Sequence, residues 1–127
     1  MWKDFAVYIT NKCSPSDKVV EVGVGKFNQV SNYLKEHYKM NIILTDIKPS
    51  HLGVVEDDIT QPQQSLYENA SLIYSIRPPG ELHQPLMDIA DKTGAILIIK
   101  PLANEDILTS KKMRLVNYNK AFFYIYP

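Results

Sequence analysis

The sequence predicts an α/β fold with a mostly parallel sheet that ends in an antiparallel hairpin. Short apolar stretches alternate with segments of helical periodicity, as in strands joined by helical crossovers. The stretches 41–45 and 95–99 contain uninterrupted apolar runs, which is typical of strands that are buried on both faces. The stretches 113–118 and 121–126, of which the second is rich in aromatic residues, are joined by Asn119 and Lys120 and are typical of a hairpin.

Helices are predicted where apolar residues recur at spacings of three and four. This spacing indicates a short helix from Trp2, a helix over 28–38, and a helix that follows the break at 78–80 and ends at Gly94. Two shorter helices are expected, one after Pro62 and one that begins at Glu105 and is capped by Asn104.

Strands are predicted where apolar and branched residues stand between turn-forming residues. They cover 18–22, 41–45, 54–55, 71–76, 95–99, 113–118 and 121–126. The stretch 54–55 is short and is expected at an edge of the sheet. Alternating strands and helices predict a Rossmann-like arrangement, and we expect a single domain over 1–127.

Composition excludes several classes of protein. Lys and Arg together number 14, as do Asp and Glu, which argues against a strongly basic nucleic-acid binder. Cys13 is the only cysteine, so we expect no internal disulfide and a cytoplasmic location. The three histidines lack metal-ligand spacing, so no metal is expected. No apolar run reaches about 18 residues, and no membrane span is expected.

The most informative stretch is 18–49, in which a strand, a glycine turn, an amphipathic helix, a second strand and an aspartate follow in order. Gly23 and Gly25 come directly after the first strand, and glycine lets the backbone approach a ligand closely. Asp46 ends the second strand, where its carboxylate can accept hydrogen bonds from both hydroxyls of a ribose. The pattern indicates a nucleotide-type ligand, and the alternative is an ordinary tight turn with a solvated aspartate.

The run Glu21–Gly25, EVGVG, resembles the first motif of class I S-adenosylmethionine (SAM)-dependent methyltransferases, in which an acid precedes Gly-x-Gly. The resemblance implies a three-layer, methyltransferase-like fold and SAM as the cofactor. It places Asp46 at the ribose, and Asp58 and Ile59 around the adenine. The cofactor-binding residues that it implies are Glu21, Gly23, Gly25, Asp46, Asp58 and Ile59.

A narrower resemblance covers nearly the whole chain. The runs 45–50 (TDIKPS), 57–60 (DDIT) and 73–79 (IYSIRPP) resemble a small archaeal protein family of unknown function with a methyltransferase-like fold. This resemblance leaves the activity and the catalytic residues open.

Two departures from the methyltransferase pattern matter. Phe27 stands where a third glycine is usual; it can narrow the methionine end of a pocket, although a core role is favoured. Arg77-Pro78-Pro79 shares only its two prolines with the Asn/Asp-Pro-Pro-aromatic motif of amino-methyltransferases, so N-methylation is not supported.

Two other functions stay open. The glycine turn with Asp46 and 57–60 also resembles minimal NAD-binding domains that regulate ion transport, so NAD or NADH is the alternative ligand of a non-catalytic module. A third alternative is an interaction domain that no longer binds a cofactor. The sequence leaves undecided whether the protein is an enzyme.

Lys48, Arg77 and Lys100 each follow a predicted strand closely and each precede a proline. Ligands of open α/β sheets bind outside the carboxyl ends of the strands, so these cations are expected to form one anion-binding or substrate-binding site. The alternative is that all three are solvated. Glu81 and His83 follow as candidates for a general acid or base, although a solvated helix start is preferred.

Partners are indicated only weakly. The basic cluster Lys111, Lys112 and Arg114 suggests RNA as one partner, against solvation as the simpler alternative. The aromatic residues of the terminal hairpin suggest packing or the edge of a homodimer, so the expected state is a monomer or a dimer through this hairpin, with RNA or another protein as further partners.

Overall fold

The computed structural model describes residues 2–103 and 105–127, in which seven strands form one sheet. The strand order is β3-β2-β1-β4-β5-β7-β6. Strands β1 to β5 all run parallel to one another, β7 is antiparallel to β5, and β6 is antiparallel to β7. The bounds are β1 Lys18–Val22, β2 Asn41–Asp46, β3 Val54–Glu56, β4 Ala70–Ile76, β5 Ile96–Lys100, β6 Arg114–Tyr118 and β7 Ala121–Tyr126.

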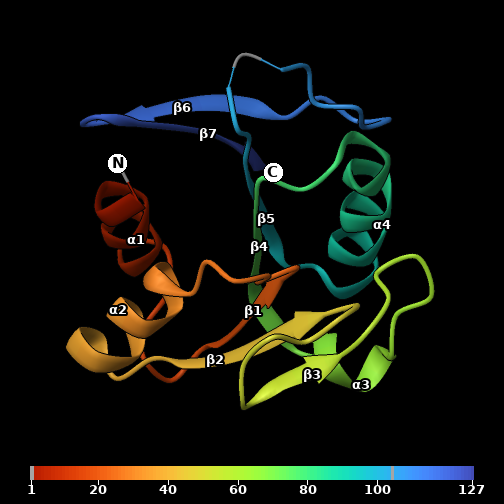
Figure 1. Ribbon diagram of the computed structural model, residues 1–127. Coiled ribbons are helices and arrows are strands. Elements are labelled where there is room, and N and C mark those ends of the chain that lie inside the picture. The colour runs from red at the N-terminus through yellow and green to blue at the C-terminus, as the bar shows by residue number, and fades with distance from the viewer. Residues whose placement is uncertain (1, 104) are drawn as a thin grey trace.

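Helices cover both faces of this sheet, so the molecule has three layers (Figure 1). Helices α1 (Trp2–Thr10) and α2 (Gln29–Tyr38) lie on one face, and α4 (His83–Thr93) lies on the other. The short helix α3 (Gln64–Tyr67) precedes β4, and the 3₁₀ turn η1 (Gly80–Leu82) leads into α4. The predicted α/β, Rossmann-like fold with its terminal hairpin is therefore confirmed.

The side chains of the strands alternate between two cores. On β1, Val19 packs with the core beneath α1 and α2, whereas Val20 and Val22 pack with the core beneath α4. Both cores are well covered at β1, since Val19 and Val20 have no exposed surface. This alternation fixes the register of β1 and determines which face Glu21 occupies.

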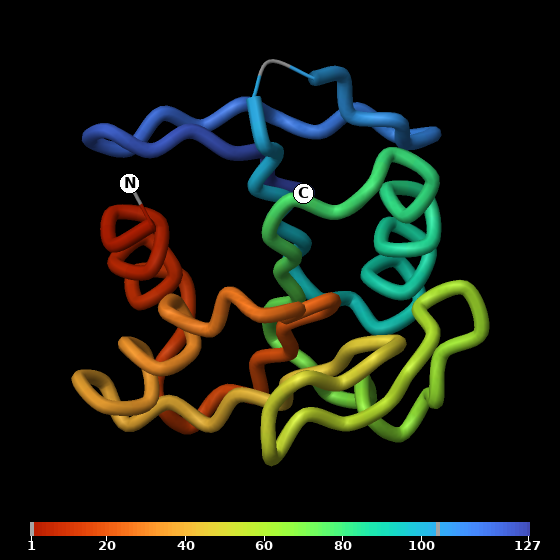
Figure 2. The backbone as a smooth tube through the Cα atoms, viewed as in Figure 1, coloured from red at the N-terminus to blue at the C-terminus, as the bar shows by residue number. Residues whose placement is uncertain are grey.

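The chain that follows β5 crosses the molecule before it returns to the sheet. It passes the start of α4, β6 then runs back toward α1, and β7 returns from there to pair with β5 (Figure 2). At the far end of this hairpin the Tyr8 and Tyr118 rings meet edge to face, with their centroids 5.4 Å apart. The hairpin thus joins the two helical layers at one end of the sheet.

One predicted helix is absent. Residues 105–109 are irregular, and Asn104, its expected cap, lies outside the described residues. The Leu108 N–H donates to His83 Nδ1 at 3.0 Å, and the Ser110 N–H donates to Gln84 Oε1 at 2.6 Å. Backbone groups that a helix would have used are therefore bound by side chains of α4. The expectation of a solvated His83 was also wrong, because this side chain is fully buried.

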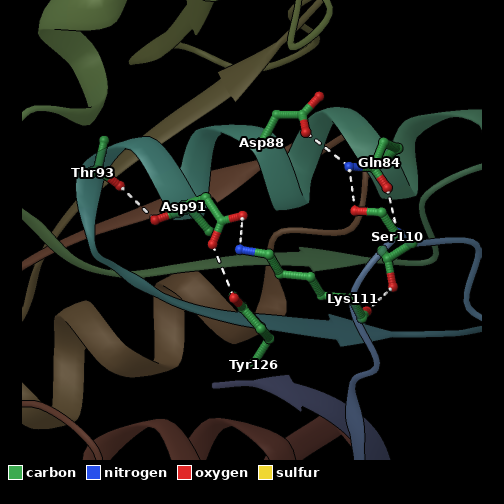
Figure 3. A network of polar contacts seen from close by, with 9 residues as sticks. Gln84, Asp88, Asp91, Thr93, Ser110, Lys111 and Tyr126 are labelled. Carbon is green, nitrogen blue, oxygen red and sulfur yellow. Dashed lines mark hydrogen bonds and ion pairs between the residues drawn. The ribbon is translucent and has the colours of Figure 1, made fainter.

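A polar network holds this segment and β7 against α4 (Figure 3). Asp91 accepts hydrogen bonds from Lys111 Nζ at 2.9 Å and from the Tyr126 hydroxyl at 3.0 Å. The bond from Lys111 and that from Tyr126 lower the pKa of Asp91. One cation of the predicted basic cluster is thus already paired within the chain. Among the described residues, no helix has the length and the apolar character that crossing a membrane requires.

Candidate functional site

The glycine turn between β1 and α2 is held against the end of β2. Gly23 and Gly25 have φ of +72° and +57°, values that side chains with a Cβ rarely adopt. The N–H groups of Gly23 and Val24 both donate to the Thr45 carbonyl, at 2.9 and 3.1 Å. A Cβ added at Gly25 would meet nothing within 4 Å. The turn is therefore fixed on one side and open on the other.

Asp46 ends β2 beside this turn. Its Oδ2 accepts the Gly25 N–H at 2.6 Å, and its Oδ1 accepts the Lys48 N–H at 2.8 Å. Each carboxylate oxygen can accept a second hydrogen bond. The carboxylate is therefore oriented by the backbone and keeps acceptor capacity for two hydroxyls of a ligand.

Glu21 lies inside the sheet, with 1% of its surface exposed. Its Oε1 accepts the Tyr74 hydroxyl at 2.7 Å, and no described residue hydrogen-bonds to its Oε2. Burial raises the pKa of Glu21 to about 7; the bond from Tyr74 and the charge of Lys35 oppose this rise, and the charge of Asp46 adds to it. Because this oxygen is itself buried, it is satisfied either by its own proton or by a donor that a ligand brings into the core.

The two aspartates after β3 have different roles. Asp57 is buried and accepts the Tyr67 hydroxyl at 2.7 Å and the Gln63 N–H at 2.9 Å. Its own N–H donates to the Asp46 carbonyl at 3.0 Å, which places this segment next to β2. Asp57 is thus a structural residue.

Asp58 is half-buried, and its contacts are local. Its Oδ1 accepts both the N–H and the hydroxyl of Thr60, and these bonds lower the pKa of Asp58. The Ile59 side chain is buried in the core beneath α4. Asp58, rather than Asp57, is therefore the acid with a carboxylate oxygen that no described residue uses.

A cavity of about 290 Å³ lies between the end of the sheet and the helices α1 and α2. Arg77 and Lys100, which follow β4 and end β5, both line it. Lys48, the third predicted cation, is exposed in the loop after β2 and is not part of the lining. The other lining residues are Trp2, Phe5, Phe27, Val30, Ile76, Pro101 and Leu102.

The cations of this cavity rest against aromatic rings. The Arg77 guanidinium carbon is 5.7 Å from the centroid of Phe27, and Lys100 Nζ is 3.9 Å from that of Phe122. Phe27 also packs against the core beneath α2, which confirms its predicted core role. The helical spacing of Trp2 and Phe5 indicated only core packing, and it did not reveal their place in the cavity.

Comparison with solved structures supports a methyltransferase-like fold. An S-adenosyl-L-methionine methyl transferase from Silicibacter pomeroyi DSS-3 aligns with a TM-score of 0.59 at 13% identity, covering 96% of this chain and 88% of that one. A mutant of MtNAS in complex with S-adenosylmethionine aligns with a TM-score of 0.62 at 12% identity, covering 98% of this chain and 60% of that one. At these identities the likeness concerns the fold alone.

Sequence relatives are archaeal. A UPF0146 protein from Methanothermobacter thermautotrophicus is 57% identical over 126 residues, which are 99% of this chain and 95% of the relative. Another from Archaeoglobus fulgidus is 39% identical over 112 residues, which are 85% and 82% of the two chains. Residues 2–127 match the model of the uncharacterised protein family UPF0146, and the chain belongs to this family.

Proposed function

We propose that this protein binds SAM across the glycine turn and is a methyltransferase-like protein whose substrate is not yet defined. The observation that carries the proposal is the Asp46 carboxylate, which the backbone N–H groups of Gly25 and Lys48 hold at the open side of the turn. Each oxygen retains a lone pair for one ribose hydroxyl. The fold of the two structural neighbours supports the same assignment.

Glu21 fits the charge of such a ligand. A buried carboxyl oxygen without a partner favours a ligand that brings a hydrogen-bond donor or a positive charge. SAM carries an ammonium group and a sulfonium, and Glu21 would face the ammonium. Asp58 would accept from the adenine amino group through the carboxylate oxygen that Thr60 does not use.

The residues around the glycine turn fit the alternative ligand, NAD or NADH, less well than SAM. A dinucleotide brings a pyrophosphate to the glycine turn, and a buried acid directly before the turn disfavours an anion there. The dinucleotide fingerprint also needs a third glycine for close packing of helix on strand, and Asn28 occupies that position.

Thermal denaturation with added ligand tests the proposal. SAM or S-adenosylhomocysteine at 100 times its dissociation constant should stabilise the protein by about 2.7 kcal/mol. Asp46→Asn should weaken binding about tenfold or more, because a hydrogen bond to a charged acceptor contributes about 1.5–3 kcal/mol. Asp106→Asn is the matched control, since Asp106 is exposed in the segment after β5. Stabilisation by NADH and not by either SAM ligand would refute the proposal.

A further inference from the structure

The cavity between Arg77 and Lys100 has the form of a binding site for a small ligand. Its volume of about 290 Å³ is just below the range for small-molecule sites, about 300–1,000 Å³. Most of its wall is apolar or aromatic, from α1, α2 and the segment after β5. The two cations are its charged groups. Such a wall fits an apolar body, and the cations add a requirement for negative charge.

The two cations lack a counter-ion within the described chain. Neither Arg77 nor Lys100 forms an ion pair with any described carboxylate. Lys100 is half-buried, and both this burial and the nearby Arg77 lower its pKa. Two neighbouring positive charges beside an apolar wall repel each other, and an anion bound between them would remove this repulsion.

The backbone holds Arg77 in this place at a cost. Arg77 has a φ of +56°, which is uncommon for a residue with a side chain. Its N–H donates to the Lys100 carbonyl at 2.7 Å, and Pro78 and Pro79 follow it with fixed φ. Backbone conformations of this kind cluster at ligand-binding sites, where the surrounding structure maintains them.

We propose that Arg77 and Lys100 bind the carboxylate of a small acid whose apolar body fills the cavity, and that this acid is the substrate of the protein. The guanidinium offers a planar fork that matches a carboxylate, and the lysine offers a point charge. A carboxylate carries one negative charge and is easier to desolvate against an apolar wall than a phosphate dianion. The name "substrate" rests on the proposed SAM site, whereas binding of the acid does not.

The cavity adjoins the proposed SAM site along the chain and across the sheet. Phe27, which lines the cavity, follows Gly25 by two positions. β4, which leads into Arg77, pairs directly with β1, which leads into the glycine turn. An acid held by these cations would therefore lie on the neighbouring strand ends, where a transferred group has to be received.

Trp2 supplies a direct measurement, because it is the only tryptophan in the chain and it lines the cavity. Phenylacetate is a suitable probe, and phenylacetamide is its uncharged counterpart. The Trp2 indole N–H resonance should shift on titration with phenylacetate and should respond about tenfold more weakly to phenylacetamide. Equal responses to the two compounds would overturn the role of the charge.

Variants locate the charge. Arg77→Gln and Lys100→Gln should each weaken the binding of phenylacetate about tenfold. Lys48→Gln is the matched control, because Lys48 also precedes a proline after a strand but does not line the cavity. The amide spectrum of each variant shows whether it is folded. If one cation variant does not fold, the other still tests the proposal. A loss in Lys48→Gln equal to that in Arg77→Gln would overturn the proposal, and so would a site that takes inorganic phosphate and not phenylacetate.

A second comparison distinguishes binding of an acid by the two cations from binding of the cofactor at the proposed SAM site. S-adenosylhomocysteine carries an amino-acid carboxylate, and 5′-methylthioadenosine lacks it. If Arg77→Gln weakens the binding of S-adenosylhomocysteine and not that of 5′-methylthioadenosine, the cations bind the carboxylate of the cofactor. The substrate assignment is then overturned. If Arg77→Gln leaves both unchanged and weakens phenylacetate, the proposal is supported. If neither adenosine compound binds while phenylacetate behaves as expected, the proposed SAM site fails and the acid site stands.

Discussion

Replacing Glu21 with glutamine should remove a large part of the pH dependence of stability. Burial raises the pKa of Glu21 from an ordinary value of 4.5 to about 7 in the folded protein. The folded state therefore holds this proton more tightly than the unfolded state does. The protonated carboxyl stabilises the fold fully below about pH 4.5, and this contribution is lost as the pH rises to about 7.

The size of the effect follows from the shift. Each pKa unit corresponds to about 1.4 kcal/mol, so the contribution lost is on the order of 3 kcal/mol. Glutamine stays uncharged and can still accept the Tyr74 hydroxyl through its carbonyl. Relative to the parent, Glu21→Gln should therefore gain about 3 kcal/mol in the free energy of unfolding between about pH 4.5 and pH 8.

Urea denaturation at several pH values in this range measures the difference between variant and parent. Burying the glutamine amide can add a constant cost to the free energy of unfolding of the variant. Such a cost is the same at every pH, so it does not change how the difference between variant and parent varies with pH. Contributions from ionisable groups that both proteins share cancel in that difference. Glu36→Gln, on the exposed face of α2, is the control and should follow the parent. Parallel curves for Glu21→Gln and the parent would refute the assignment of a raised pKa to this carboxyl.

Three further changes test the site and its support. Asp58→Ala should weaken the binding of SAM more than the binding of an inosine analogue, which lacks the adenine amino group. Equal losses of affinity in calorimetry would show that Asp58 does not contact the adenine. Gly25→Ala should cost about 1–2 kcal/mol from its positive φ alone, because a Cβ there meets no atom within 4 Å, and a urea titration giving a much larger loss would reveal a clash. Tyr67→Phe should cost about 1–3 kcal/mol, since it leaves the buried Asp57 carboxylate without its 2.7 Å bond; unchanged thermal stability would show that water replaces that hydroxyl.

Local patterns predicted the elements well because each of those elements is specified by its own residues. Apolar spacing located α1 and α2, and Gly94, with φ of +77°, ends α4 as expected. The helix expected at Glu105 failed for a non-local reason. The N–H groups of Leu108 and Ser110 are bound by side chains of α4, and that contact is not visible in the sequence of the segment.

In the candidate site too, contacts within one crossover unit could be predicted from the sequence, and contacts that depend on the strand order could not. Gly25 and Asp46 could be placed together from sequence because consecutive parallel strands of one crossover unit pair directly. The strand order separates Lys48 from the other two cations. β4 and β5 are neighbours, and β1 lies between β2 and β4. Periodicity does not encode this order, and it also could not bring Phe122 of β7 to Lys100.

The place of β7 between β5 and β6 has a consequence for biosynthesis. During translation, β5 is complete well before residues 121–126 leave the ribosome, and its described partners are β4 and β7. Until then its Leu97–Ile99 segment, which later pairs with Tyr124–Tyr126, is an uncovered and strongly apolar edge. Open edges of this kind recruit strands from other chains. The nascent protein is therefore most prone to aggregate in the interval between the synthesis of β5 and the docking of β7.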